Sequence, residues 1–192
     1  MTESSAAAGM IEATRRWIAE LVVGESLCPF AQGLLEAERV GIAVAPHGDL
    51  EGLLHALADE AIRLSQRAAS ELETTLLLHP GTLEGFDAQL DFLAAVEALL
   101  DDLKLGSTLQ VVSFHPDYRF EDAAAGDPAN YTNRSPFAMF HLLRRRSVEA
   151  ATDSHPDPDS IWRRNVDRLR ELGAEELEAK LQQMRSLANA AG

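Results

Sequence analysis

The sequence predicts an α/β protein, with a small, mainly parallel sheet of about three strands flanked by helices. Three short apolar runs, at residues 40–45, 74–78 and 108–114, alternate with long stretches in which apolar residues recur at helical spacing. Long crossovers return the chain to the edge of the sheet where it began, which favours parallel strands. We therefore expect a β-α-β-α-β core, with an N-terminal helix before it and a C-terminal helical tail after it.

Length and charge narrow the class of protein. A chain of 192 residues fits one domain, which we place at residues 10–190, after a small, polar segment at 1–9 that we expect to be disordered. The net charge is −14, and the only dense basic run is Arg144–Arg146. We interpret this run as the C-terminal turn of a helix, where cations suit the helix macrodipole. Since binding of nucleic acid needs a broad basic face, we expect no nucleic-acid partner.

The sequence also bears on cellular location. The chain has one cysteine, so it cannot form an intrachain disulfide. Its first residues lack the basic and apolar regions of a signal peptide, and no stretch approaches the roughly 18 apolar residues of a membrane span. We therefore expect a cytoplasmic protein with no membrane partner.

Local signals place the elements in the first part of the chain. Apolar residues at helical spacing predict a helix from about Ile11, and Gly24 is a natural stop. Cys28, followed by Pro29 at the first helical position, is typical of a second helix start. After the first strand, Asp49 can cap a third, long helix.

The second part of the chain contains a strand, a loop and more helices. The run at 74–78 is continuously apolar, as in a strand buried on both faces. Residues 116–134 form a polar loop with aromatic side chains, and loops of this length are often functional, so we expect an ordered, functional loop. We predict a helix at 135–150 and two more at about 158–189. The last of these packs on the domain or on a second subunit, which would give a homodimer.

Each predicted strand ends beside a histidine, namely His47, His79 or His115. In an open parallel sheet, ligands bind at the carboxyl ends of the strands, and these ends share one edge. The three imidazoles are therefore candidates for one site. A histidine at a strand end can also simply cap backbone carbonyls, and this interpretation suits His47 best because it lies in a glycine-containing turn.

Cys28 is a candidate nucleophile. At a helix start its sulfur would face free N–H groups, which favours the thiolate. The alternative is that Cys28 is a small buried hydrophobic residue, as free cysteines often are.

The segment around Arg134 is a candidate anion site. Ser135 as N-cap and Pro136 at the first helical position would define a helix start with free N–H groups, and Arg134 beside it offers a bidentate donor to carboxylate or phosphate. The alternative is a satisfied turn in which Arg134 has a structural role. His141 in the same predicted helix is either a base or a core histidine. Three further side chains would orient a polar ligand here: Asn133, Tyr131 and Tyr118.

Three phrases of the sequence resemble a known family. They are Cys28-Pro29-Phe30-Ala31, Phe114-His115-Pro116 followed by Tyr118 and Phe120, and Asn133-Arg134-Ser135-Pro136 leading to His141-Leu142-Leu143-Arg144. This pattern is similar to an uncharacterised bacterial and plant family catalogued as domain of unknown function number 1415, over most of the chain. The resemblance implies no activity, cofactor or fold. It favours Cys28, His115, Arg134 and His141 over His47 and His55.

Three hypotheses about function follow. The first is an enzyme in which Cys28 attacks a small anionic substrate held by Arg134, with His115 or His141 as the base. The second is a metal site built from His79 and His115, with or without Cys28, for a transition metal such as zinc. The third is a non-catalytic module that binds a small anion or a partner protein.

Overall fold

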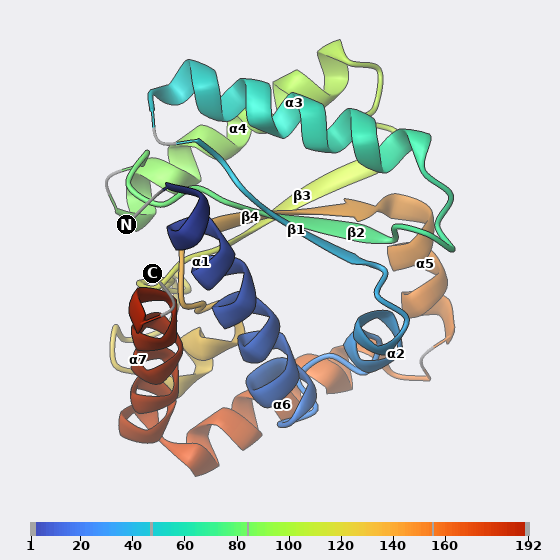
Figure 1. Ribbon diagram of the computed structural model, residues 1–192. Helices are drawn as coiled ribbons and strands as arrows, with labels where there is room; N and C mark the ends of the chain where they lie inside the picture. Colours follow the sequence, from blue (N-terminus) through green and yellow to red (C-terminus); the bar gives the residue numbers. More distant parts are fainter. Residues whose placement is uncertain (1–2, 47, 84, 155, 191–192) are drawn as a thin grey trace. The chain divides into compact units, whose positions relative to one another are not determined.

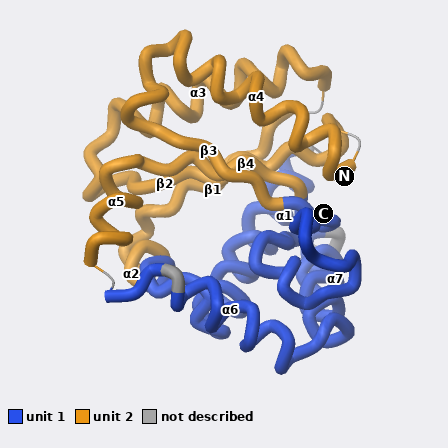
Figure 2. Tube along the Cα trace, turned by 180° about the vertical axis from the view of Figure 1, so that it is seen from behind, with its two compact units in different colours: residues 1–32, 115–137, 155–192 blue, residues 33–114, 138–154 orange. Residues whose placement is uncertain are grey.

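The computed structural model describes residues 3–46, 48–83, 85–154 and 156–190 (Figure 1). The chain divides into two compact units, each assembled from separate stretches of sequence (Figure 2). We call residues 33–114 and 138–154 the sheet unit, and residues 1–32, 115–137 and 155–192 the helical unit. Each unit is described by itself.

The sheet unit contains a four-stranded sheet in the order β1-β2-β4-β3 (Figure 1). Strand β1 pairs in parallel with β2, whereas β4 is antiparallel to both β2 and β3. The prediction of a mainly parallel sheet of about three strands is therefore wrong in strand number and in pairing. Because β4 is reversed between its neighbours, β1, β2 and β3 still run in the same direction. The strands are β1 (Val40–Val44), β2 (Thr74–Leu78), β3 (Leu109–Phe114) and β4 (Met139–Arg144).

Strand β4 replaces most of the helix that we predicted at 135–150. Ser135 does not cap a helix, since its Oγ donates to the carbonyl of Phe137 at 2.7 Å. Strand β4 follows, and only then does helix α5 (Arg145–Ser154) begin. A short apolar run fits a buried strand or a buried helix equally well, and here hydrogen bonding to strands on both sides decides the outcome. His141 therefore lies on a central strand and not on a helix.

Helices α3 (Leu50–Gln66) and α4 (Phe86–Asp102) cover one face of the sheet (Figure 1). Asp49 caps α3 as predicted, because its Oδ1 accepts the N–H of Gly52 at 2.9 Å. Burial of apolar side chains between helix and sheet is the main stabilising contribution here. The core includes Leu53 and Leu57 of α3, Phe92 and Val96 of α4, and Leu77 and Phe140 of the sheet.

The helical unit confirms the predicted N-terminal helix and the two C-terminal helices. Helix α1 begins at Glu3, inside the segment 1–9 that we expected to be disordered. It packs along α7, and a Cβ at Gly9 would lie only 2.6 Å from the carbonyl oxygen of Ala188. Gly9 therefore allows the close approach of these two helices. The helices are α1 (Glu3–Trp17), its π-helical continuation (Ile18–Val23), a 3-10 turn (Pro128–Thr132), α6 (Pro158–Leu172) and α7 (Ala174–Ala190).

One short helix, α2 (Ala31–Glu36), lies where the chain passes from the helical unit into the sheet unit. Within the described residues, none of the helices has the length and apolar character needed to cross a membrane.

Candidate functional site

The residues that the sequence singles out fall into both units, so each group is considered within its own unit. His47 lies outside the described residues. His79 and His141 belong to the sheet unit. The helical unit holds Cys28, His115, Tyr118, Tyr131, Asn133, Arg134 and Ser135.

Cys28 does not start a helix, contrary to our prediction. Pro29 lies in a turn, and α2 begins only at Ala31, whose N–H donates to the carbonyl of Cys28 at 3.3 Å. The Cys28 thiol is half-buried and free, and it forms no hydrogen bond with another described residue. The helix start that we predicted at Cys28 is therefore missing, and a catalytic role for this residue stays a prediction.

His115 follows directly after β3, and its backbone N–H donates to the carbonyl of Asn133 at 3.3 Å. Its ring Nδ1 accepts the N–H of Asp117 at 3.0 Å, so the ring proton is on Nε2. Burial lowers the pKa of His115 below its usual value, and the nearby Asp117 carboxylate only partly opposes this. His115 is therefore neutral and its lone pair is engaged. It can act as a base only if the bond to Asp117 opens.

Arg134 stabilises the loop between β3 and β4 by binding two backbone carbonyls of that loop. Its Nε donates to the carbonyl of Tyr118 at 3.0 Å, and its Nη2 donates to the carbonyl of Ala125 at 2.9 Å. Its guanidinium also lies over the ring of Tyr131, 4.7 Å from the centroid. The sequence left open a structural role for Arg134, and these contacts show one, with carbonyls and a ring as partners.

The same loop is ordered by a buried amide. The Oδ1 of Asn130 accepts the N–H of Phe120 at 3.0 Å, and its Nδ2 donates to the carbonyl of Ala124 at 2.9 Å. The hydroxyl of Tyr131 donates to the carboxylate of Glu178 at 3.0 Å. Burial raises the pKa of Tyr131, and a hydrogen bond with Arg134 opposes this. The predicted order of the loop is confirmed, while its function stays a prediction.

Three further candidates, Tyr118, Asn133 and Ser135, have hydrogen-bond partners within the helical unit. Burial raises the pKa of Tyr118, and a hydrogen bond with the side chain of Asn133 acts against this shift. These two side chains thus pair with one another. Ser135 is buried and bonded to Phe137, as described above.

His141 lies on β4 between β2 and β3. Its Nε2 is 2.7 Å from the Oγ1 of Thr74, and that hydroxyl donates to the carbonyl of Leu142 at 2.6 Å. Since a carbonyl can only accept, the imidazole must be the donor to Thr74. Its ring also lies 6.0 Å from that of Phe114. Burial lowers the pKa of His141 to about 4, so the ring is neutral at neutral pH. These contacts match the alternative of a core histidine.

His79 ends β2 and is buried. Its backbone N–H donates to the carbonyl of Ala138 at 3.1 Å, which extends the pairing of β2 with β4, and its ring stacks on Phe140 at 4.8 Å. Among the described residues, no three histidine, cysteine or acidic side chains gather where they could hold a metal ion.

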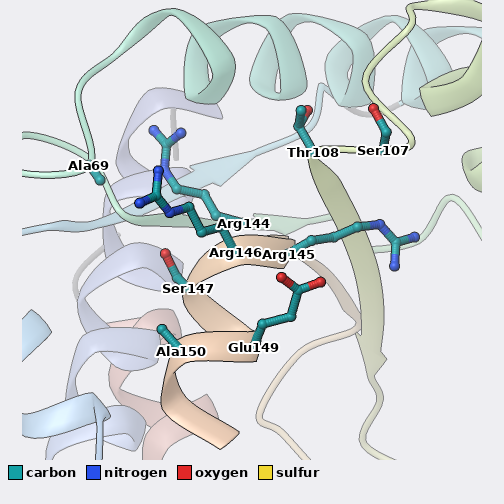
Figure 3. A pocket seen from close by; sticks show the side chains of 9 residues that line it. All are labelled: Ala69, Ser107, Thr108, Arg144, Arg145, Arg146, Ser147, Glu149 and Ala150. Carbon is teal, nitrogen blue, oxygen red and sulfur yellow. The ribbon is translucent and has the colours of Figure 1, made fainter. Parts of the chain in front are cut away.

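The structure contains a pocket that sequence reasoning missed. It is a surface cavity of about 550 Å³ in the sheet unit, at the end where β3 begins and β4 finishes (Figure 3). We call it the arginine pocket. This end is opposite to the carboxyl ends of β1, β2 and β3, where we expected a ligand. The pocket is lined by Ala69, Ser107, Thr108, Arg144, Arg145, Arg146, Ser147, Glu149 and Ala150.

Our interpretation of Arg144–Arg146 as the C-terminal turn of a helix is wrong. Strand β4 ends at Arg144 and helix α5 begins at Arg145, so the run lies at the N-terminus of a helix. This is the positive end of the helix macrodipole, where cations are disfavoured. The wrong position of these arginines has the same cause as the missed strand β4. We assigned the apolar run before them to a helix, so they became the end of that helix.

Arg144 and Arg145 are held by neutral partners. The Nη2 of Arg144 donates to three carbonyls at 2.7–3.0 Å, two of them in the last turn and C-cap of α3. The Nε of Arg145 donates to the carbonyls of Gly106 and Leu109 at 2.7 and 3.0 Å. A carbonyl orients a guanidinium but does not cancel its charge. Within the part of the chain that the structure describes, no carboxylate forms an ion pair with either arginine.

Arg146 and Glu149 are the free charges of the arginine pocket. Both side chains are exposed, and neither has a hydrogen bond or an ion pair with any described residue. The hydroxyl groups of Ser107, Thr108 and Ser147 line the same cavity. The Thr108 hydroxyl already donates to the carbonyl of Leu105 at 3.0 Å. The pocket therefore combines fixed positive charge with unused donors on Arg146, Ser107 and Ser147.

Fold and site together define a mixed α/β protein with a basic pocket at the end of a mixed sheet where β3 begins and β4 finishes. The family described as "Protein of unknown function (DUF1415)" matches residues 9–179, and the chain belongs to this family. The resemblance noted in the sequence is thereby confirmed. No curated protein and no solved structure matches the chain. The family supplies no activity, so the function must be argued from the residues.

Proposed function

We propose that this protein binds a small anion, through a phosphate or carboxylate group, in the arginine pocket. One observation carries this proposal: three consecutive arginines lie at the positive end of α5, and no described carboxylate forms an ion pair with them. Like charges and the helix macrodipole make this arrangement unfavourable by itself. A bound anion would convert the same arrangement into a favourable one.

The groups around the cavity suit an anion with several oxygen atoms. A phosphate or carboxylate accepts charge-assisted hydrogen bonds from guanidinium, hydroxyl and backbone N–H donors. Arg146 supplies the free guanidinium, and Ser107 and Ser147 supply hydroxyl donors. Arg144 and Arg145 add positive charge from fixed positions, because their side chains are anchored to carbonyls.

Inorganic phosphate is the simplest probe of this proposal. We expect Arg146→Gln to weaken phosphate binding about five- to tenfold, as measured by isothermal titration calorimetry at low ionic strength, since one charge-assisted hydrogen bond is lost. Arg146 is the residue to change because its side chain has no hydrogen-bond partner among the described residues. Arg144 and Arg145 bind backbone carbonyls, so changing them would also alter the stability of the protein.

The control is Arg119→Gln, which removes the same charge from another exposed arginine without a hydrogen bond or ion pair to a described residue. We expect this variant to bind phosphate as the wild type does. The proposal is overturned if the wild type does not bind phosphate, or if both variants lose affinity equally, which would indicate only a general effect of charge.

The enzyme suggested by the sequence is a second proposal, restricted to residues of the helical unit: Cys28 as nucleophile, Arg134 holding the substrate and His115 as base. The half-exposed, free thiol of Cys28 supports it. The test is the rate of Cys28 alkylation at neutral pH. A rate well above that of free cysteine supports the proposal, and an equal or slower rate overturns it.

A further inference from the structure

We infer that the ligand of the arginine pocket is a small zwitterion, with its anionic group on Arg146 and an ammonium group on Glu149. This inference rests on the proposed function and specifies the class of ligand. It concerns compounds in which a phosphate or carboxylate lies a few bonds from an amino group.

The first observation is a carboxylate inside a basic pocket. Glu149 lines the same cavity as the three arginines and is exposed. It lies three and four residues after Arg146 and Arg145 on α5, a spacing at which opposite charges often pair. Neither pair forms here. Glu149 is therefore not used to neutralise the arginines, and its charge faces the cavity.

The second observation is how the side chains divide around the cavity. Figure 3 shows Arg144, Arg146 and Ser147 on one side of the view, and Glu149 with Arg145 on the other. One part of the pocket thus contains the free guanidinium of Arg146, and the other contains the carboxylate of Glu149 beside Arg145, whose Nε is bound to carbonyls. A ligand that bears both charges can use both parts at once.

The negative charge of Glu149 favours a zwitterion over an anion that carries no positive group. Glu149 repels a plain anion bound at Arg146, because the two negative charges share one small cavity. An ammonium group on the ligand turns this repulsion into attraction. Arg146 and Glu149 lie about one helical turn apart, with Cβ atoms about 5–6 Å apart, so a ligand of a few bonds that lies between the two side chains can contact both. An aminoalkyl phosphate or a small amino acid has this form.

The experiment compares matched probes by isothermal titration calorimetry at low ionic strength. Phosphoethanolamine and propyl phosphate carry the same phosphate group. The chain of phosphoethanolamine ends in an ammonium group, and that of propyl phosphate ends in a methyl group. β-Alanine and butyrate form the corresponding carboxylate pair. We expect the wild type to bind at least one zwitterion about fivefold more tightly than its methyl counterpart, and the better pair identifies the anionic group.

Two variants test whether Glu149 is the cause. We expect Glu149→Gln to abolish this preference and to strengthen binding of the methyl counterpart about twofold, because the repulsion is removed. Glu97→Gln on α4 removes the charge of another exposed glutamate that has no partner among the described residues, and it should retain the preference.

The outcomes separate this inference from the proposed function. If neither propyl phosphate, butyrate nor their zwitterionic partners bind, the proposed function itself fails. If each zwitterion and its methyl counterpart bind equally, or if Glu149→Gln leaves a preference intact, anion binding stands and the zwitterion inference is overturned.

Discussion

Protonation of His141 should limit the stability of this protein in acid. The unfolded chain takes up a proton at an ordinary histidine pKa of 6.5, whereas burial lowers the pKa in the folded protein to about 4. Between these two pH values the unfolded state binds more protons. The stability linked to His141 is therefore fully present above about pH 6.5 and is lost as the pH falls toward about 4.

The size of this effect follows from the pKa shift. It corresponds to a loss of at most about 2 kcal/mol near pH 5 and about 3 kcal/mol near pH 4. These values are upper limits because the His141 side chain is only partly shielded from solvent. The cause is burial of the ring, whose neighbours are the neutral hydroxyl of Thr74, to which it donates, and the ring of Phe114 at 6.0 Å.

The perturbation is His141→Gln, which keeps an N–H donor for Thr74 and removes the titrating group. The assay is urea unfolding at about pH 7, 6, 5 and 4. We expect the variant to be less stable than the wild type near pH 7, and this deficit to shrink by up to about 3 kcal/mol near pH 4. Comparison at each pH cancels the contribution of His115, whose pKa is also lowered.

The control is His55→Gln, which removes an exposed imidazole of α3 and should leave the stability of the protein close to that of the wild type. A constant difference in free energy between His141→Gln and the wild type, from about pH 7 to about 4, would refute the reasoning. It would mean that the His141 ring accepts a proton in the folded protein as easily as in the unfolded chain.

Two further predictions concern stability alone. Arg144→Lys should lower the free energy of unfolding by about 2–4 kcal/mol in urea titrations, because the shorter lysine side chain does not carry its ammonium nitrogen to the position from which Nη2 binds three carbonyls, and a change below about 0.5 kcal/mol would contradict this role. Gly9→Ala should lower the free energy of unfolding by about 1–3 kcal/mol, because the added Cβ meets the backbone of Ala188. Gly33→Ala has open space around its Cβ and should be neutral or slightly stabilising, so equal effects of the two glycine variants would refute this explanation.

The parts of the fold that could be predicted are those with local signals. The strand at Thr74–Leu78 was predicted with its observed bounds, since five apolar or β-branched residues between turns leave little choice. The cap at Asp49 was predicted because its hydrogen bond to Gly52 is local. The direction shared by β1, β2 and β3 was also predicted, because long helical crossovers require it.

What could not be predicted depends on contacts between distant residues. No local sequence signal near Met139–Arg144 indicates that this segment inserts between β2 and β3. Strand β2 lies 60 or more residues earlier in the chain, and β3 lies about 30 residues earlier. The position of Arg144–Arg146 at a helix start, and hence the arginine pocket, follows from that insertion. A cytoplasmic location and a homodimer through the C-terminal helices stay predictions from the sequence.

The insertion of β4 between β2 and β3 has a consequence for synthesis and folding. A nascent chain that has reached Phe114 contains three strands that run in one direction, but β2 and β3 lack the strand that joins them. Their open edges can pair with other chains until Met139–Arg144 leaves the ribosome. The intervening residues 115–137 belong to the helical unit, so neither unit corresponds to one contiguous gene segment. Truncation before residue 144 should therefore yield aggregated protein and not a smaller folded domain.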